Sequence, residues 1–239
     1  MSTSYLHIIQ SCLTCKLREE RLFCNLHDGA LQELNRIKIV KNYPQGATLL
    51  AEGEPAEGIM VICQGRVKLS ASSADGKKMI INIAEAGEVL GLSSVIAAKP
   101  SEATAESLEP VQINFIHRAQ FLQFMDRHKE VGLRTAQELS AVHERACREL
   151  RLLGLPQSVT QKMALLLLQW AQQASPAHPN LIKVSLTHEE IAQLLGTTRE
   201  SVNRTLGDLK RTKVISVQGV NVRILDDARL RSIAGLQEI

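Results

Sequence analysis

The sequence predicts an α+β fold in three parts: an antiparallel β-region, a long helix, and a smaller helical region that ends in a β-hairpin. Three observations support this prediction. Short β-prone runs alternate with glycine-marked turns between residues 26 and 116. Residues 118–153 contain no proline and one glycine, Gly132, as a long helix requires. The last third holds two helical patterns separated by a glycine, followed by runs in which apolar and polar residues alternate.

The composition is that of an ordinary globular protein. The 239 residues allow two modest domains or one large one, and 44% of them are hydrophobic. No apolar run approaches the roughly 18 residues of a membrane span, and the first residues lack the pattern of a secretory signal. We therefore expect a cytoplasmic protein with reduced thiols and no membrane partner. The net charge of +3 identifies no partner by itself.

The β-region is marked by its turns. The stretch 48–91, TLLAEGEPAEGIMVICQGRVKLSASSADGKKMIINIAEAGEVLG, carries six glycines between β-prone pieces such as IMVIC, RVKLS and MIINI, and its turn signals recur at roughly ten-residue spacing. The segment ADGKK is a candidate hairpin tip because Asp-Gly favours tight turns. This spacing predicts an antiparallel sandwich or barrel.

The long helix carries one apolar stripe, formed by Leu139, Val142, Ala146, Leu150 and Leu153. The stripe is suited to packing against a second copy of the helix or against its own domain, and the periodicity leaves both open. The sequence GLP at 154–156 then interrupts the pattern. We therefore expect a sensor domain at 1–117, a dimerisation helix at 118–153 and a separate domain at 154–239.

The segment SLTHEEIAQLLGTTRESVNRTLGDLKRTKVISVQGVNVRIL, 185–225, predicts a winged helix-turn-helix. Thr187 and Glu190 form a capping box at the start of the first helix. Gly196 permits the sharp turn that follows, and Thr198 is a candidate N-cap for the second helix. The final alternating strands, on either side of 218–219, form the wing.

The second helix has the features of a DNA-reading helix. An α-helix fits the major groove, where arginine pairs with guanine and glutamate accepts from cytosine. Between residues 196 and 213 there are five basic and two acidic residues, which favours phosphate contact. We expect binding to double-stranded DNA, because 3% aromatic residues are too few for stacking on single strands. The candidate contacts are Thr198, Arg199, Glu200, Asn203, Arg204 and Lys210.

The order of β-region, long helix and winged helix-turn-helix resembles the CRP/FNR family of bacterial transcription regulators. The supporting motifs are IMVICQGRVKLS, DGKKMIINIAEAGEVLG and LTHEEIAQLLGTTRESVNRTLGDLKRTKVI. The resemblance implies a cyclic-nucleotide-binding-like β-roll, a homodimer joined by the long helix, and an activator or repressor that acts on RNA polymerase. It assigns base reading to Arg199, Glu200 and Arg204. Arginine at 199 is similar to the cyclic-AMP receptor branch, which reads TGTGA-type half-sites.

The nucleotide site of that branch is not matched. Cyclic-nucleotide members hold the sugar-phosphate with a Gly-Glu pair and, about ten residues later, an Arg-Ser or Arg-Thr pair. The corresponding stretch here is GLSSVIAAKPSEATAES, in which Leu92 stands at the glutamate position. No arginine occurs between Arg66 and Arg118, and a phosphate without an arginine partner is poorly held. We therefore expect no response to cyclic AMP.

Three of the five cysteines, Cys12, Cys15 and Cys24, lie within CLTCKLREERLFC. The FNR branch holds a [4Fe–4S] cluster through three N-terminal cysteines and a fourth in the last β-roll strands. The resemblance implies the same cofactor here, as a sensor of oxygen, nitric oxide or redox state. The matching late strand, VQINFI, contains no cysteine. We expect the basic neighbours Lys16, Arg18 and Arg21 to favour the thiolate forms. Candidates for the fourth ligand are Cys63, Cys147, a carboxylate of Glu20 or Asp28, and His27.

Other uses of the cysteines stay open. A zinc site or a thiol switch would use the same residues, and the regulator could also respond to an unidentified small effector. An enzyme with a cysteine nucleophile would need a base, a substrate pocket and an oxyanion motif. The sequence supplies no such set, so we do not expect an enzyme.

Overall fold

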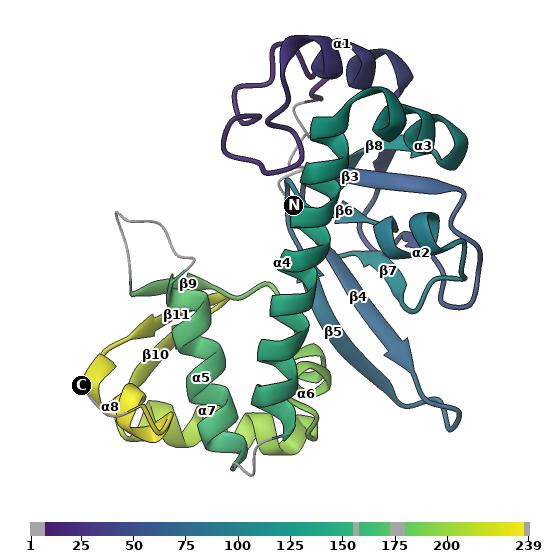
Figure 1. Ribbon diagram of the computed structural model, residues 1–239. Helices are drawn as coiled ribbons and strands as arrows, with labels where there is room; N and C mark the ends of the chain where they lie inside the picture. The colour runs from purple at the N-terminus through teal and green to yellow at the C-terminus, as the bar shows by residue number, and fades with distance from the viewer. Residues whose placement is uncertain (1–7, 155–157, 173–179, 237–239) are drawn as a thin grey trace. The chain divides into compact units, whose positions relative to one another are not determined.

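The computed structural model describes residues 8–154, 158–172 and 180–236 (Figure 1). The chain divides into two compact units, Met1–Ala146 and Cys147–Ile239. The GLP interruption and the loop 174–180 fall largely outside the described residues. The α+β fold predicted from the sequence is confirmed: a β-roll comes first, then a long helix, then a helix-turn-helix with a small sheet.

Among its described residues, the first unit contains two four-stranded antiparallel sheets, ordered β1-β8-β3-β6 and β2-β7-β4-β5. The hairpin predicted at ADGKK joins β4 and β5, with Gly76 at φ 80°. The strands are β1 Ile39–Tyr43, β2 Thr48–Leu50, β3 Gly58–Gln64, β4 Val67–Ser72, β5 Lys78–Ala84, β6 Val89–Leu90, β7 Thr104–Ser107 and β8 Val111–His117.

Two helices lie in the stretch that the glycine spacing predicted to be β-structure. They are α1 (Asp28–Ile37) and α2 (Leu92–Ala97). In α1 the buried residues follow the helical period, so that one face packs into the core, and this signal was missed. Those residues are Ala30, Leu31, Leu34 and Ile37.

Strand β3 is buried on both faces, and this determines where the cysteine segment lies. Met60 and Ile62 belong to a core cluster within the roll, shared by both sheets. Ile59 and Val61 belong to a second cluster on the other face, with residues of α1 and α3 (Arg118–Arg127). Successive side chains of a strand point to opposite faces, which explains this division. The second cluster also contains Cys12 and Phe23, so the cysteine segment covers the outer face of the first sheet.

The stretch 118–153 is divided into α3 and α4 (Lys129–Gly154). His128 between them is extended, at φ −121° and ψ 96°. Its Nε2 lies 2.8 Å from a carboxylate oxygen of Glu33, and its ring packs edge-on against Phe124, which holds the break in place. On α4, the stripe residues Val142 and Leu150 are 47% and 68% exposed.

The described part of the second unit contains four further helices and a three-stranded sheet ordered β10-β11-β9. Strands β10 and β11 form the predicted wing, and they turn at Gly219, which has φ 58°. Strand β9 and helix α8 were not predicted. The elements are α5 Val159–Gln172, β9 Leu181–Lys183, α6 His188–Leu195, α7 Arg199–Arg211, β10 Ile215–Gln218, β11 Asn221–Ile224 and α8 Asp227–Ile233.

Candidate DNA interface and cysteine site

The helix-turn-helix forms as the local sequence predicts. Thr187 and Glu190 make the reciprocal capping box of α6, with the Glu190 N–H donating to the Thr187 hydroxyl at 3.2 Å. Gly196 ends the helix at φ 60°, a left-handed conformation that glycine adopts without strain. The Thr198 hydroxyl accepts from the Ser201 N–H at 3.3 Å and caps α7. These caps fix where the second helix begins, and so which residues lie in its first turns.

Helix α7 buries one face and exposes the other. Val202, Leu206 and Leu209 are buried in the unit, as predicted. The candidate base-reading side chains lie on the exposed face, where they are accessible to a ligand. All six candidate contacts are exposed: Thr198, Arg199, Glu200, Asn203, Arg204 and Lys210.

Two of these side chains have partners of their own. Asn203 is hydrogen bonded through its Oδ1 to Nδ1 of His188, at the start of α6. The Glu200 carboxylate accepts from its own backbone N–H and from the Thr198 hydroxyl, which lowers its pKa. Glu200 therefore stays ionised at neutral pH and remains a hydrogen-bond acceptor. The hydrogen bond between His188 and Asn203 was not predicted, because these residues lie 15 positions apart in the sequence and on different helices.

The N-terminal cysteine segment lies in the first unit. Cys12 is buried, and Cys15 and Cys24 are half-buried. Cys63 is buried on β3, at a register shift in its pairing with β8: Ile62 pairs with Ile113 and Gln64 with Gln112. Cys63 is therefore the extra residue of a β-bulge, a feature that re-aims a side chain.

The thiols of Cys12, Cys15, Cys24 and Cys63 lie close enough to interact electrostatically in every pairwise combination. The structure thus gathers the three N-terminal cysteines with one of the proposed fourth ligands. None of the five cysteines, all of which lie within the described residues, forms a disulfide bond. Cys147, another proposed fourth ligand, lies on α4 in the second unit.

Burial, rather than the basic neighbours, dominates the acidity of these thiols. It raises the pKa of Cys24 to about 12 and that of Cys63 to about 11, and it raises the pKa of Cys12. Arg21 acts in the opposite direction on Cys24 and Cys63, but more weakly. The expectation that basic neighbours favour the thiolates is therefore wrong for Cys12 and Cys24, because burial withdraws their sulfurs from water.

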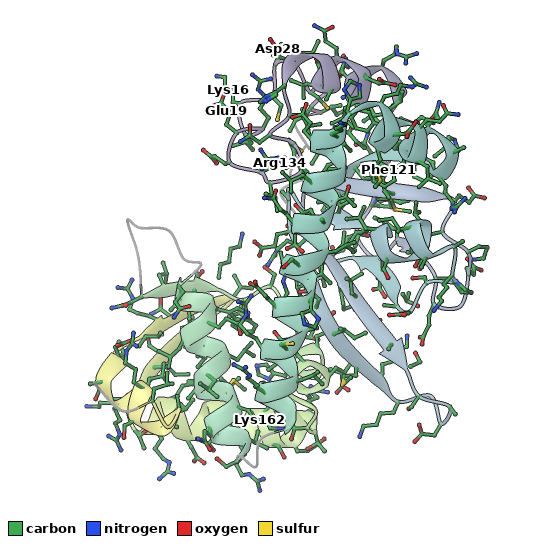
Figure 2. All side chains as sticks on the ribbon, viewed as in Figure 1. Lys16, Glu19, Asp28, Phe121, Arg134 and Lys162 are labelled. Carbon is green, nitrogen blue, oxygen red and sulfur yellow. The ribbon has the colours of Figure 1, made fainter. Side chains whose placement is uncertain are left out.

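The remaining candidate ligands near the segment differ from these four cysteines in burial. Glu20, His27 and Asp28 are exposed. Figure 2 labels Lys16, Glu19 and Asp28 along the outside of the segment and at the start of α1. Within the described residues, no three His, Cys, Asp or Glu side chains converge as ligands of one metal ion.

Polar side chains surround Cys12. The Asn114 Nδ2 donates to the Cys12 sulfur at 3.4 Å, and Lys38 hydrogen bonds with the same thiol. The Cys12 N–H donates to Asn35 Oδ1 at 2.9 Å. Just before it, the backbone of Ile9 pairs with the Gln112 amide at 2.8 and 2.6 Å. Residues 9–12 are thus held on α1 and β8.

The other end of the segment is held on α4. The buried Glu138 carboxylate, 7% exposed, accepts a hydrogen bond from the backbone N–H of Phe23. The His27 N–H donates to both oxygens of Glu130 at 3.1 and 3.3 Å. The cysteine segment therefore lies between the first sheet and the long helix.

The position at which nucleotide-binding members have a glutamate is apolar here. Leu92 is 4% exposed and packs in the outer core cluster. Arg118 uses its Nε to donate to the Val95 carbonyl at 2.8 Å. Arg118 therefore lies near α2, but its Nε is already hydrogen bonded to the α2 backbone.

A β-roll followed by a long helix and a winged helix-turn-helix defines a class, the DNA-binding transcription regulators with an N-terminal sensor domain. Residues 40–128 match the model of the cyclic nucleotide-binding domain, and residues 161–233 match that of the Crp-like helix-turn-helix domain. The chain belongs to the CRP/FNR family of transcription regulators, as predicted, and not to an enzyme family.

The chain is similar to relatives of both branches. It is 28% identical over 211 residues to the CRP-like cAMP-activated global transcriptional regulator of Mycobacterium tuberculosis, covering 87% of this chain and 94% of that one. It is 27% identical over 236 residues to the transcriptional activator protein FnrL of Cereibacter sphaeroides, covering 95% and 93%. Among solved structures, FixK2 of Bradyrhizobium japonicum shares the fold, with a TM-score of 0.74 and 20% identity over 82% of this chain and 97% of that one. Within the described residues, no helix has the length and apolar character needed to cross a membrane.

Proposed function

We propose that this regulator acts in the cytoplasm as a homodimer on inverted-repeat DNA, where it recruits or blocks RNA polymerase. We further propose that its DNA affinity depends on a [4Fe–4S] cluster held by Cys12, Cys15, Cys24 and Cys63. The observation that carries the proposal is the gathering of these four thiols, three from one segment and one from a β-bulge. When bound, such a cluster supplies a redox- and oxygen-labile group. Four cysteine thiolates are its usual ligand set.

The acidity of the thiols supports a metal-bound role over a thiol switch. A switch thiol reacts as the thiolate and lies in an electropositive, accessible place. The pKa values of Cys24 and Cys63, about 12 and about 11, keep these thiols protonated at neutral pH. A bound metal removes such protons, because a coordinating thiol is deprotonated outright.

The lack of a converging ligand set among the described residues favours a cluster over a single zinc ion. Tetrahedral zinc with bonds of about 2.3 Å requires sulfurs roughly 3.8 Å apart. In the described residues no three such groups converge on one ion, although the four thiols interact. A cluster of several metal ions is larger, and its ligands need not meet at one point.

Cys63 is the best-supported fourth ligand. Its thiol interacts with those of Cys12, Cys15 and Cys24, whereas the carboxylates of Glu20 and Asp28 are exposed. The late strand β8, where the FNR branch has its cysteine, pairs directly with β3. The ligand is thus proposed to come from the neighbouring strand of the same sheet.

Dimerisation is proposed through the exposed stripe of α4. Its members Val142 and Leu150 are 47% and 68% exposed, and large apolar side chains in a helical row favour a partner helix. A two-fold dimer would present two α7 helices to DNA half-sites one helical turn apart. With Arg199, Glu200 and Arg204 as base readers, we expect a TGTGA-like half-site.

The contacts of the cysteine segment with α4 provide a route from the site to the dimer. The backbone N–H of Phe23 is hydrogen bonded to Glu138, and that of His27 to Glu130. Ordering of the segment therefore adds contacts to the helix that carries the stripe. This shifts the population toward the DNA-binding dimer, provided that the segment is less ordered in the other state.

Anaerobic reconstitution tests the proposal. The wild-type protein should become brown and contain about four irons per chain, and air should bleach it. Cys15→Ala and Cys63→Ser should abolish the colour and weaken DNA binding, while circular dichroism stays unchanged. Cys147→Ser is the matched control and should keep the cluster. A colourless, iron-free wild-type protein would contradict the proposal, and loss of the cluster in Cys147→Ser with retention in Cys63→Ser would contradict the assignment of Cys63.

A further inference from the structure

Asn114 has a polar amide side chain at a buried position in the middle of a strand, where apolar residues are usual. It lies in the middle of β8, paired with Val61 of β3 and Val40 of β1, and it is 4% exposed. Its neighbours Ile113 and Phe115 are buried in the core within the roll. Asn114 points to the opposite face, because side chains alternate along a strand, and that face is covered by the cysteine segment.

The two ends of this amide are used differently. The Nδ2 donates to the Cys12 sulfur at 3.4 Å. The Oδ1 is buried and finds no hydrogen-bond partner among the described residues. An unpaired buried acceptor destabilises the folded state, and a leucine of similar size would avoid this cost. The donor end is therefore the part that explains an asparagine at this position.

We infer that Asn114 is a positioning residue of the cysteine site, whose N–H group holds the sulfur of Cys12 and draws electron density from it. The inference rests on the proposed function and deepens it. Cys12 is the thiol held by polar side chains of two elements, since Lys38 at the end of α1 also bonds with it. The Cys63 thiol instead donates to the carbonyl of Val61 at 3.8 Å, within its own strand.

This bond has a measurable consequence for a cluster bound at Cys12. A hydrogen bond to a ligand sulfur stabilises the state that carries the additional electron, and so raises the reduction potential. Removing the donor should make the cluster harder to reduce and easier to oxidise. The couple in question is a one-electron couple: dithionite supplies the electron in a reductive titration, and dissolved oxygen removes electrons in air.

Asn114→Leu in the reconstituted full-length protein tests the inference. At a fixed poised potential, the ratio of reduced to oxidised cluster should fall about tenfold, equivalent to about 59 mV for one electron. Bleaching in air should be several-fold faster than in the wild-type protein. Asn82→Leu, the same substitution on β5 in the other sheet, is the control and should change neither quantity.

Two further variants separate the hydrogen bond from packing. Asn114→Gln keeps an N–H donor and should stay close to the wild-type potential. Asn114→Asp has the same shape but replaces the donor with an acceptor, and it should shift the potential at least as far as leucine does. It also provides the measurement if the leucine variant does not fold.

The outcomes distinguish this inference from the proposed function. A wild-type protein that takes up no cluster would overturn both. A wild-type protein with a cluster, together with Asn114→Leu or Asn114→Asp variants of unchanged potential and unchanged rate of bleaching, would overturn the role of Asn114 alone. A glutamine variant that shifts as far as the leucine variant would also overturn it, because the effect would then come from packing.

Discussion

The recognition helix and the cysteine site differ in how much of the chain is needed to build them. Residues 187–211 contain the caps, the turn and the exposed face of the helix-turn-helix in one continuous segment. The cysteine site combines residues 12–24 with Cys63 of β3, Asn114 of β8 and Glu138 of α4. A DNA-reading surface can therefore form from local rules, whereas the sensor site depends on the fold of a whole unit.

The largest effect is expected for a substitution on the DNA-reading face of α7. Arg204→Ala should weaken specific DNA binding by about 1–3 kcal/mol and relax discrimination at one guanine, because a bidentate contact to a base edge is lost. Fluorescence anisotropy at fixed salt, with consensus and substituted duplexes, measures both effects. Arg211→Ala is the control on the same helix, since Arg211 is paired with Asp208 at 2.9 Å. Equal losses on all duplexes would show that Arg204 contacts phosphate only.

A smaller effect is expected at the contact between the cysteine segment and the long helix. Burial, and then Glu88, raise the pKa of Glu138 against the weaker influence of Arg145 and the Phe23 N–H. The folded state therefore binds the proton of the Glu138 carboxyl group more tightly than the unfolded state does. Glu138 thus favours folding at low pH, and this contribution is lost as the pH rises through the pKa of the folded state.

Glu138→Gln removes this titration, and urea unfolding of the cluster-free protein from pH 4.5 to 8 measures the outcome. The free energy of unfolding of the wild-type protein, relative to that of the variant, should decline as pH rises. Carboxylates that do not interact with Glu138, including Glu33 with its lowered pKa, are common to both proteins and cancel in the difference. A difference that is constant with pH, or that rises, would contradict the burial of an ionisable Glu138.

No effect is expected from cyclic AMP. Leu92 is buried where nucleotide-binding members have a glutamate, and Arg118 is bonded to the backbone of α2. Calorimetry should detect no saturable binding at micromolar nucleotide, and DNA affinity should stay unchanged. The cAMP-activated relative from Mycobacterium tuberculosis provides a positive control. Saturable binding would show that this unit holds the phosphate by a means other than the usual arginine.

The sequence predicted those parts whose causes lie close together in the chain. Caps, glycine turns and amphipathic periods identified α6, α7, the wing and the β4–β5 hairpin. Helix α1 was missed because the nearby glycine spacing suggested strands. The choice among fourth ligands could not be made, because it depends on the bulge at Cys63 and on its pairing with β8. The basic residues near the cysteines predicted lowered thiol pKa values, whereas burial raises them, and burial cannot be read from local composition.

The bond between Phe23 and Glu138 has a consequence for the order of events during synthesis. The three N-terminal thiols leave the ribosome first, but the strand, the amide and the carboxylate that enclose them are translated later. The enclosure is complete only after residue 138 has emerged, when more than half of the chain has been made. Until then the thiols are attached to a nascent segment without its covering layers. Maturation of the cysteine site is therefore coupled to completion of the first unit, and a chain truncated before α4 would leave these thiols exposed to solvent.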